Sequence, residues 1–139
     1  MTSITRTTAY LCFASFSLAS GISFAQPPVI KATLLDNAIQ VEVSSIKAGK
    51  VTFEANNASE AKVVHEMVVL KTPMADDKLP VKAGKVPEKE FKKMGEVEDV
   101  AVGKSKRLTL HLAAGHYVLI CNKSGHYQMG LHTSLTVTP

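Results

Sequence analysis

The chain has 139 residues, of which 45% are hydrophobic and 20% charged, a balance typical of one globular domain rather than of a disordered segment. The net charge of +4 is spread over interleaved lysines and glutamates, and Arg6 and Arg107 are the only arginines, so we expect no nucleic-acid partner. The only cysteines are Cys12 and Cys121, which excludes a scaffold held together by several disulfides.

Residues 1–25 have the pattern of a secretory signal peptide. Arg6 supplies a positive start, an uncharged apolar stretch follows, and Ser23-Phe24-Ala25 fits the small-x-small cleavage rule. A membrane anchor is the alternative, but the stretch is short for a span and is interrupted by serines and a glycine. We therefore expect cleavage after Ala25, a periplasmic domain over residues 26–139, and no membrane insertion of that domain.

Cys121 is the only cysteine of this predicted mature domain, so it cannot form an internal disulfide. Exported proteins usually pair their cysteines. The thiol is therefore either buried and inert or protected by a metal ion, because a coordinating thiol is deprotonated and capped.

The mature domain is predicted to be β-rich. Alternation of apolar and polar residues, or a short apolar run, predicts strands over 29–35, 39–43, 51–55, 63–71, 108–112, 116–121 and 134–138, with turn residues between them. About seven or eight short strands in one domain predict an all-β fold, a two-sheet Greek-key sandwich or barrel.

Residues 72–104 interrupt the strand pattern. Pro73, Pro80 and Gly84 indicate a long loop, and residues 87–94 predict one or two helical turns with proline at the first position. Phe91 and Met94 are three residues apart, so both are expected to be buried on one side of that helix. A connection of this length either carries function or covers a sheet edge.

The residues with metal-binding chemistry are His65, Cys121 and His126. A thiolate and an imidazole with four residues between them, in a turn that contains Gly125, can converge on one ion. His65 is an isolated imidazole in an apolar strand, and the alternation directs both strands' donors between the sheets. Two imidazoles and one thiolate in a trigonal arrangement are the donor set of blue copper sites.

The same segment resembles a known family. The run Tyr117-Val118-Leu119-Ile120-Cys121-Asn122, followed by Gly125-His126-Tyr127 and Gly130, is similar to the copper-binding end of the small exported cupredoxins, the plastocyanin/azurin-like blue copper proteins. His65-Glu66 matches the upstream ligand region, and the resemblance covers essentially all of residues 26–139. It implies a Greek-key sandwich, one Cu(I)/Cu(II) ion in a mononuclear type 1 site, and electron transfer.

The sequence departs from this family at the axial position. Leu131 stands where most relatives have a methionine, five positions beyond His126. Leucine cannot coordinate, so we expect a three-coordinate copper with a high reduction potential. Met129 is an alternative axial ligand if the loop is tighter, and His132 is a further alternative that would give a harder, more tetragonal site.

Other polar residues near these ligands are expected to have supporting roles or none. His111 alternates outward from its strand and His116 follows a glycine turn, so both are expected at the surface. Glu66 is expected to point away from the site, and Asn122 is expected to tie the ligand loop together through a bond from its side chain to the backbone.

The function favoured by these residues is soluble one-electron transfer. Electrons would leave through the ring of His126 to a redox protein partner, which would dock on an apolar rim formed by Tyr127, Met129 and Leu131. The alternative is copper binding for handling or resistance. An enzyme is not expected from a small domain with one metal cluster, and a zinc site with the same three ligands is conceivable.

Overall fold

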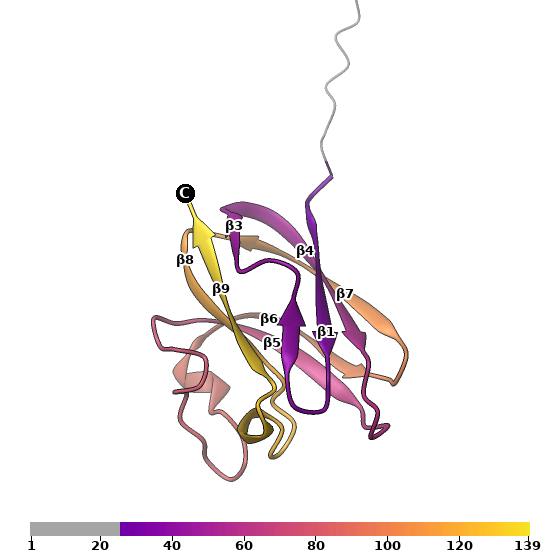
Figure 1. Cartoon of the computed structure of the whole chain (residues 1–139). Helices are drawn as coiled ribbons and strands as arrows, with labels where there is room; N and C mark the ends of the chain where they lie inside the picture. Colours follow the sequence, from indigo (N-terminus) through magenta and orange to yellow (C-terminus); the bar gives the residue numbers. More distant parts are fainter. Residues whose placement is uncertain (1–25) are drawn as a thin grey trace, which may run out of the picture.

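The strands of this protein form two sheets that pack face to face, as shown by a computed structural model that describes residues 26–139 (Figure 1). Nine strands lie within this range: β1 (Val29–Leu34), β2 (Ile39–Val41), β3 (Ser45–Lys47), β4 (Gly49–Asn57), β5 (His65–Lys71), β6 (Lys92–Val100), β7 (Ser105–Leu112), β8 (Gly115–Ile120) and β9 (His132–Thr138). Two single turns of 3-10 helix interrupt them, η1 (Glu88–Glu90) and η2 (Tyr127–Met129). The predicted all-β sandwich is confirmed.

The two sheets have the strand orders β2-β1-β4-β7 and β3-β9-β8-β5-β6. Strands β1 and β4 run parallel, as do β3 and β9, and the other neighbours are antiparallel. Alternation decides which face is buried. In β1 the side chains of Ile30, Ala32 and Leu34 enter the core between the sheets, whereas Lys31 is exposed.

A second apolar cluster lies on the outer face of the five-stranded sheet. Val68, Leu70, Val118 and Ile120 point outward from β5 and β8, where residues 72–91 cover them with the side chains of Leu79, Val81, Val86 and Phe91. We call residues 72–91 the covering segment. Because β5 and β8 are buried on both faces, their sequences are continuous apolar runs. The covering segment therefore packs on a sheet face, not only along an edge.

Of the one or two helical turns predicted over residues 87–94, one is confirmed, directly after Pro87, and the rest of that stretch is not helical. Only the turn η1 is helical, and β6 begins at Lys92 as the antiparallel neighbour of β5. Phe91 contacts the outer cluster and Met94 contacts the core between the sheets, so these two side chains lie on opposite faces of a sheet. Pairing with the free edge of β5 outweighs the local helical preference.

The predicted signal peptide and its cleavage after Ala25 lie outside the described residues, in the part drawn in grey in Figure 1. Within residues 26–139, no helix is long and apolar enough to cross a membrane.

Candidate metal centre

The topology brings the three predicted ligands to one end of the sandwich. His65 is the first residue of β5 and Cys121 directly follows β8, and these strands are antiparallel neighbours with Val68 opposite Ile120. The start of one strand therefore lies beside the end of the other. His126 stands on the loop between β8 and β9, immediately before η2.

The three donor atoms form a compact triangle. The Sγ of Cys121 lies 3.3 Å from Nδ1 of His126 and 3.7 Å from Nδ1 of His65, and the two imidazole nitrogens are 3.2 Å apart. A point equidistant from atoms with these separations lies about 2.0 Å from each, close to the length of a metal–imidazole bond and slightly shorter than a metal–thiolate bond. Among residues 26–139 this is the one cluster of three or more histidine, cysteine or acidic side chains with such spacing.

The burial of Cys121 makes ionisation of its thiol depend on a bound metal ion. Cys121 is fully buried, and burial raises the pKa of its thiol, although the amide N–H of Glu66 donates to Sγ at 3.4 Å and opposes this shift. A thiol with a raised pKa stays protonated at neutral pH unless a metal ion displaces the proton. The predicted thiolate ligand is therefore a state that metal binding itself produces.

Both imidazoles are held in the neutral form that a metal ligand requires. Burial lowers the pKa of His65, and the neighbouring His126 lowers it further. Burial also lowers the pKa of His126, with a further contribution from the charge of Lys123. His65 is 1% exposed, whereas His126 is half-buried and is the most accessible of the three donors.

Backbone geometry fixes the ligand loop, residues 121–131. The amide N–H of Cys121 donates to the carbonyl of Leu131 at 2.9 Å, and that of Leu131 donates to the carbonyl of His126 at 3.2 Å. Gly130 has φ +103°, and a Cβ there would lie 2.5 Å from the carbonyl oxygen of Asn37, so only glycine fits without moving the backbone. The loop is thereby closed onto the turn between β1 and β2.

The covering segment also holds the ligand loop, which the sequence did not reveal. Asn122 accepts from the amide N–H of Val86 at 2.7 Å and donates to its carbonyl at 2.9 Å and to the Glu88 carboxylate at 2.7 Å. The hydroxyl of Tyr127 accepts from the N–H of Leu79 and donates to the carbonyl of Asp76. The bond from the Asn122 side chain to the backbone was predicted, but its partner lies 36 residues away in the chain.

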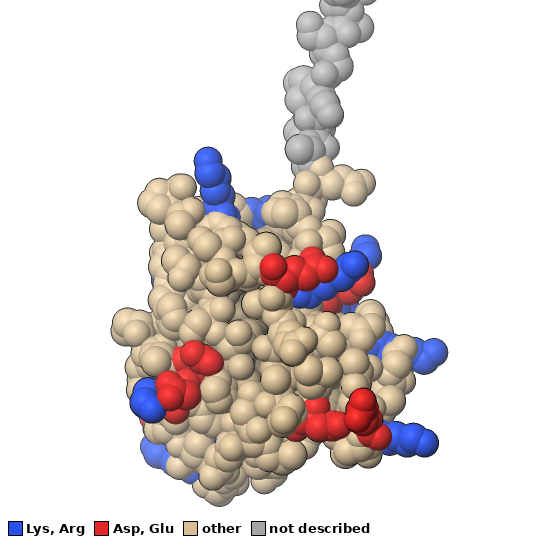
Figure 2. Space-filling model, viewed as in Figure 1, with Lys and Arg blue, Asp and Glu red and all other residues tan. Residues whose placement is uncertain are grey.

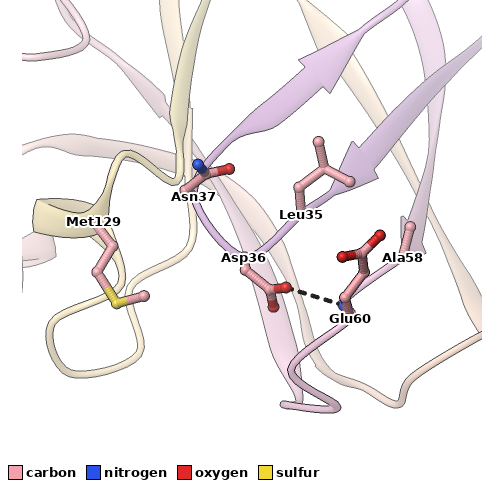
Figure 3. Close-up of a pocket in the computed structure, with 6 residues that line it drawn as sticks. All are labelled: Leu35, Asp36, Asn37, Ala58, Glu60 and Met129. Carbon is pink, nitrogen blue, oxygen red and sulfur yellow. Dashed lines mark hydrogen bonds between the residues drawn. The ribbon is translucent and has the colours of Figure 1, made fainter.

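The three axial candidates lie in different places. Leu131 is fully buried and belongs to the same core cluster as Cys121. Met129 is 57% exposed and lines a surface pocket of about 410 Å³ opposite Leu35 and Asp36 (Figure 3). His132 stands opposite Ile120 on the outer face of the sheet, with its Nδ1 2.6 Å from the Asp76 carboxylate, and it does not join the donor cluster.

The remaining predicted positions, those of two other histidines, Glu66 and the apolar rim, agree with the structure only in part. His111 is exposed, as expected. His116 was expected at the surface but is half-buried, because its ring bonds to the carbonyl of Thr72 at 2.7 Å and to the hydroxyl of Ser134 at 3.1 Å. Glu66 lies outside the donor cluster, with its carboxylate 3.9 Å from the ammonium of Lys123. The predicted apolar rim is reduced to Met129, because Tyr127 and Leu131 are buried.

Comparison with known proteins agrees with this architecture at the level of fold. No protein-family model and no curated protein sequence matches the chain. Solved structures do match. Reduced auracyanin from the photosynthetic bacterium Roseiflexus castenholzii is 19% identical with a TM-score of 0.58, over 83% of this chain and 99% of that chain. Auracyanin B is 22% identical with a TM-score of 0.59 (86% and 96%), and reduced rusticyanin is 19% identical with a TM-score of 0.59 (83% and 82%).

The chain has the cupredoxin fold. The resemblance stated from residues 117–130 and the arrangement of the strands therefore agree. Within this fold, His65, Cys121 and His126 form a candidate site for one copper ion, since their donor set and spacing fit that metal.

Proposed function

We propose that this protein is a soluble one-electron carrier that holds one type 1 copper ion through His65, Cys121 and His126. The observation that carries the proposal is the triangle of two imidazole nitrogens and one sulfur, 3.2 to 3.7 Å apart, at one end of a cupredoxin fold. Copper bound there supplies a one-electron change between Cu(I) and Cu(II). The fold contributes a fixed set of donors, so little rearrangement accompanies that change.

The axial position is proposed to be capped by Leu131. The side chain of Leu131 is buried beside Cys121 in the core, whereas the exposed thioether of Met129 faces a surface pocket. An apolar cap that cannot coordinate favours Cu(I), and burial around the sulfur adds to this preference. The expected consequence is a high reduction potential.

The electron is proposed to leave through His126, since His65 and Cys121 are buried. The surface over η2, at the lower end of the molecule, is largely free of charged side chains at its centre and has acidic side chains at its margin (Figure 2). Asp36 and Glu60 belong to that margin, because they line the pocket beside Met129. Exposed Met129 adds apolar area there. A redox protein partner that docks transiently on an uncharged patch fits this surface. The pattern of residues 1–25 supports a periplasmic location.

Copper handling without electron transfer is the second candidate. Its supporting observation is that the cluster holds two histidines and one cysteine, with no further histidine or acidic side chain joining it among the described residues, a donor set that suits tight binding of Cu(I). Reversible one-electron voltammetry of the copper-loaded domain separates the two functions. A carrier gives a reversible wave and exchanges electrons with a second redox protein, whereas a storage or resistance protein binds Cu(I) and does not reoxidise reversibly.

The metal site is tested by adding Cu(II) to the purified domain of residues 26–139. An intense visible band from charge transfer between thiolate and copper is expected, and Cys121→Ser should abolish it because a hydroxyl is a poor soft ligand. His111→Gln, on the exposed face of β7, is the matched control and should keep the band. A colourless Cu(II) complex of the unmodified domain, with tighter binding of Zn(II), would contradict the proposal.

A further inference from the structure

His65 has a second ring nitrogen that the metal site does not use. Its Nδ1 faces the sulfur of Cys121, and its Nε2 is buried without a hydrogen-bond partner. Among residues 26–139 no other buried side-chain nitrogen or oxygen lacks a partner. When Nδ1 of a neutral imidazole binds a metal ion, the ring proton is on Nε2. The structure therefore buries an N–H donor that has no direct acceptor, which is costly unless a nearby charge compensates it.

The nearby charge is the carboxylate of Asp36. Its Oδ1 lies 4.0 Å from Nε2 of His65. Asp36 stands in the turn between β1 and β2, on the wall of the surface pocket that Met129 faces from the other side (Figure 3). The carboxylate thus approaches the metal site from the side opposite the ligand nitrogen.

Asp36 is held in the ionised form and in one orientation. The hydroxyl of Ser59 donates to Oδ1 at 2.5 Å, and the amide N–H groups of Glu60 and Ala61 donate to Oδ2 at 3.0 and 3.1 Å. These bonds, led by that of Ser59, lower the pKa of Asp36. Three donors on one carboxylate make it a fixed negative charge rather than a mobile surface side chain.

We propose that Asp36 is a positioning residue for His65 and that its charge lowers the reduction potential of the copper site. This rests on the proposed function. Cu(II) with one thiolate leaves a net charge of one positive unit in the buried site, whereas Cu(I) with the same thiolate is neutral. A carboxylate close to His65 stabilises the oxidised state more than the reduced state. It also fixes the ring with its N–H toward Asp36 and Nδ1 toward the metal.

The charge of Asp36 acts against two other features. The leucine cap proposed for the axial position raises the potential, and the positive charge of Lys123 lowers the pKa of both imidazoles and acts in the same direction as the cap. Lys123 is neutralised in part by Asp99 at 2.8 Å and Glu66 at 3.9 Å. Among the lysines and arginines of residues 26–139, none lies within 4.0 Å of the Asp36 carboxylate, so its charge is available to the metal site.

The decisive variant is Asp36→Asn in the copper-loaded domain. Asparagine keeps an oxygen that accepts from the amides of Glu60 and Ala61 but removes the charge. At a fixed applied potential we expect the ratio of Cu(I) to Cu(II) to rise about tenfold, which is about 59 mV for a one-electron couple. The visible band should keep its position, because all three ligands remain. Asp36→Glu keeps the charge and should retain most of the original potential.

Glu42→Gln is the matched control for net charge. Glu42 pairs with Lys31 at an exposed site farther along the β1–β2 hairpin, so its loss should leave the potential unchanged. If Asp36→Asn keeps the band and has the potential of the unmodified domain, or if Glu42→Gln shifts the potential equally, the role assigned to Asp36 is overturned.

A second measurement does not depend on copper redox chemistry. In the Zn(II)-loaded domain, the proton on Nε2 of His65 should give a slowly exchanging ¹⁵N–¹H signal that moves in Asp36→Asn and stays in place in Glu42→Gln. If the unmodified domain never forms the visible copper band, the proposed function fails, and this signal still tests the pairing. A signal that Asp36→Asn leaves unmoved overturns the pairing.

Discussion

The two sheets of this protein are covered unequally. The four-stranded sheet buries one face and exposes the other, which carries Lys31, Lys50 and Arg107. The five-stranded sheet is buried on both faces at β5 and β8, by the core on one side and by the covering segment on the other. Two of the three donors lie at the ends of these doubly buried strands, where close packing leaves side chains the least freedom. The sheet that carries the metal site is thus the one the chain encloses.

The largest effect that we expect from this difference between the sheets is on the free energy of unfolding. Leu70→Ala, on the outward side of β5, removes a fully buried side chain under the covering segment. We expect it to lower the free energy of unfolding by about 2 to 5 kcal/mol, as for other buried leucines. Lys50→Ala on the exposed side of β4 should change it by less than about 0.5 kcal/mol. Chemical denaturation of both variants measures this, and similar losses would show that the covering segment does not protect the sheet.

Two glycines of the ligand loop differ in the space around them: Gly130 is packed against a neighbouring turn, and Gly125 is not. Gly130 and Gly125 both have positive φ, but a Cβ on Gly130 would strike the backbone of Asn37, whereas a Cβ on Gly125 meets nothing within 4 Å. We expect Gly130→Ala to cost about 2 to 3 kcal/mol and to broaden the copper spectrum, because the loop must move, and Gly125→Ala to cost about 1 kcal/mol. Thermal unfolding and the visible spectrum test this pair. Equal costs would mean that the contact with Asn37 does not constrain the loop.

The sequence predicted most of the enclosed sheet and its donors because their signals are local. The apolar run of β5 with one histidine, and the run of β8 ending in cysteine, are visible without any partner strand. Strand β6 was missed because residues 87–94 satisfy a helical pattern locally. Only the free edge of β5, far away in the sequence, provides the competing partner.

The contacts between the covering segment and the ligand loop could not be predicted for a related reason. Tyr127 and Leu79 are 48 residues apart, and a hydrogen bond from a backbone amide to a hydroxyl leaves no periodic pattern in the sequence. The same holds for the carboxylate of Asp36 near His65, which depends on how the β1–β2 turn folds over the end of β5. Polar contacts over long range follow from the fold and not from local pattern.

Asn122 connects the enclosed sheet to its cover and gives the next smaller effect. Asn122→Ala leaves the buried amide of Val86 without an acceptor and its carbonyl without this donor. The expected loss in the free energy of unfolding is about 1 to 3 kcal/mol, the cost of unpaired buried polar groups. Ser124→Ala, exposed in the same loop, is the control and should have little effect. Hydrogen exchange at the Val86 amide should speed up in Asn122→Ala alone, and unchanged protection would contradict a link through this side chain.

The smallest effect that we expect is on the reduction potential. It compares the side of the ligand loop that faces the core with the side that faces solvent. Leu131 is enclosed beside Cys121, and Met129 lies in a surface pocket. Leu131→Met should supply a weak axial ligand that stabilises Cu(II), and so lower the reduction potential by about 59 mV, a tenfold change in the one-electron equilibrium. Met129→Leu should leave the potential and the spectrum nearly unchanged and alter at most the partner surface. Voltammetry on both variants compares the two positions directly. A large shift in Met129→Leu with none in Leu131→Met would identify Met129 as the axial ligand and would show that the solvent side of this loop, not its enclosed side, closes the site.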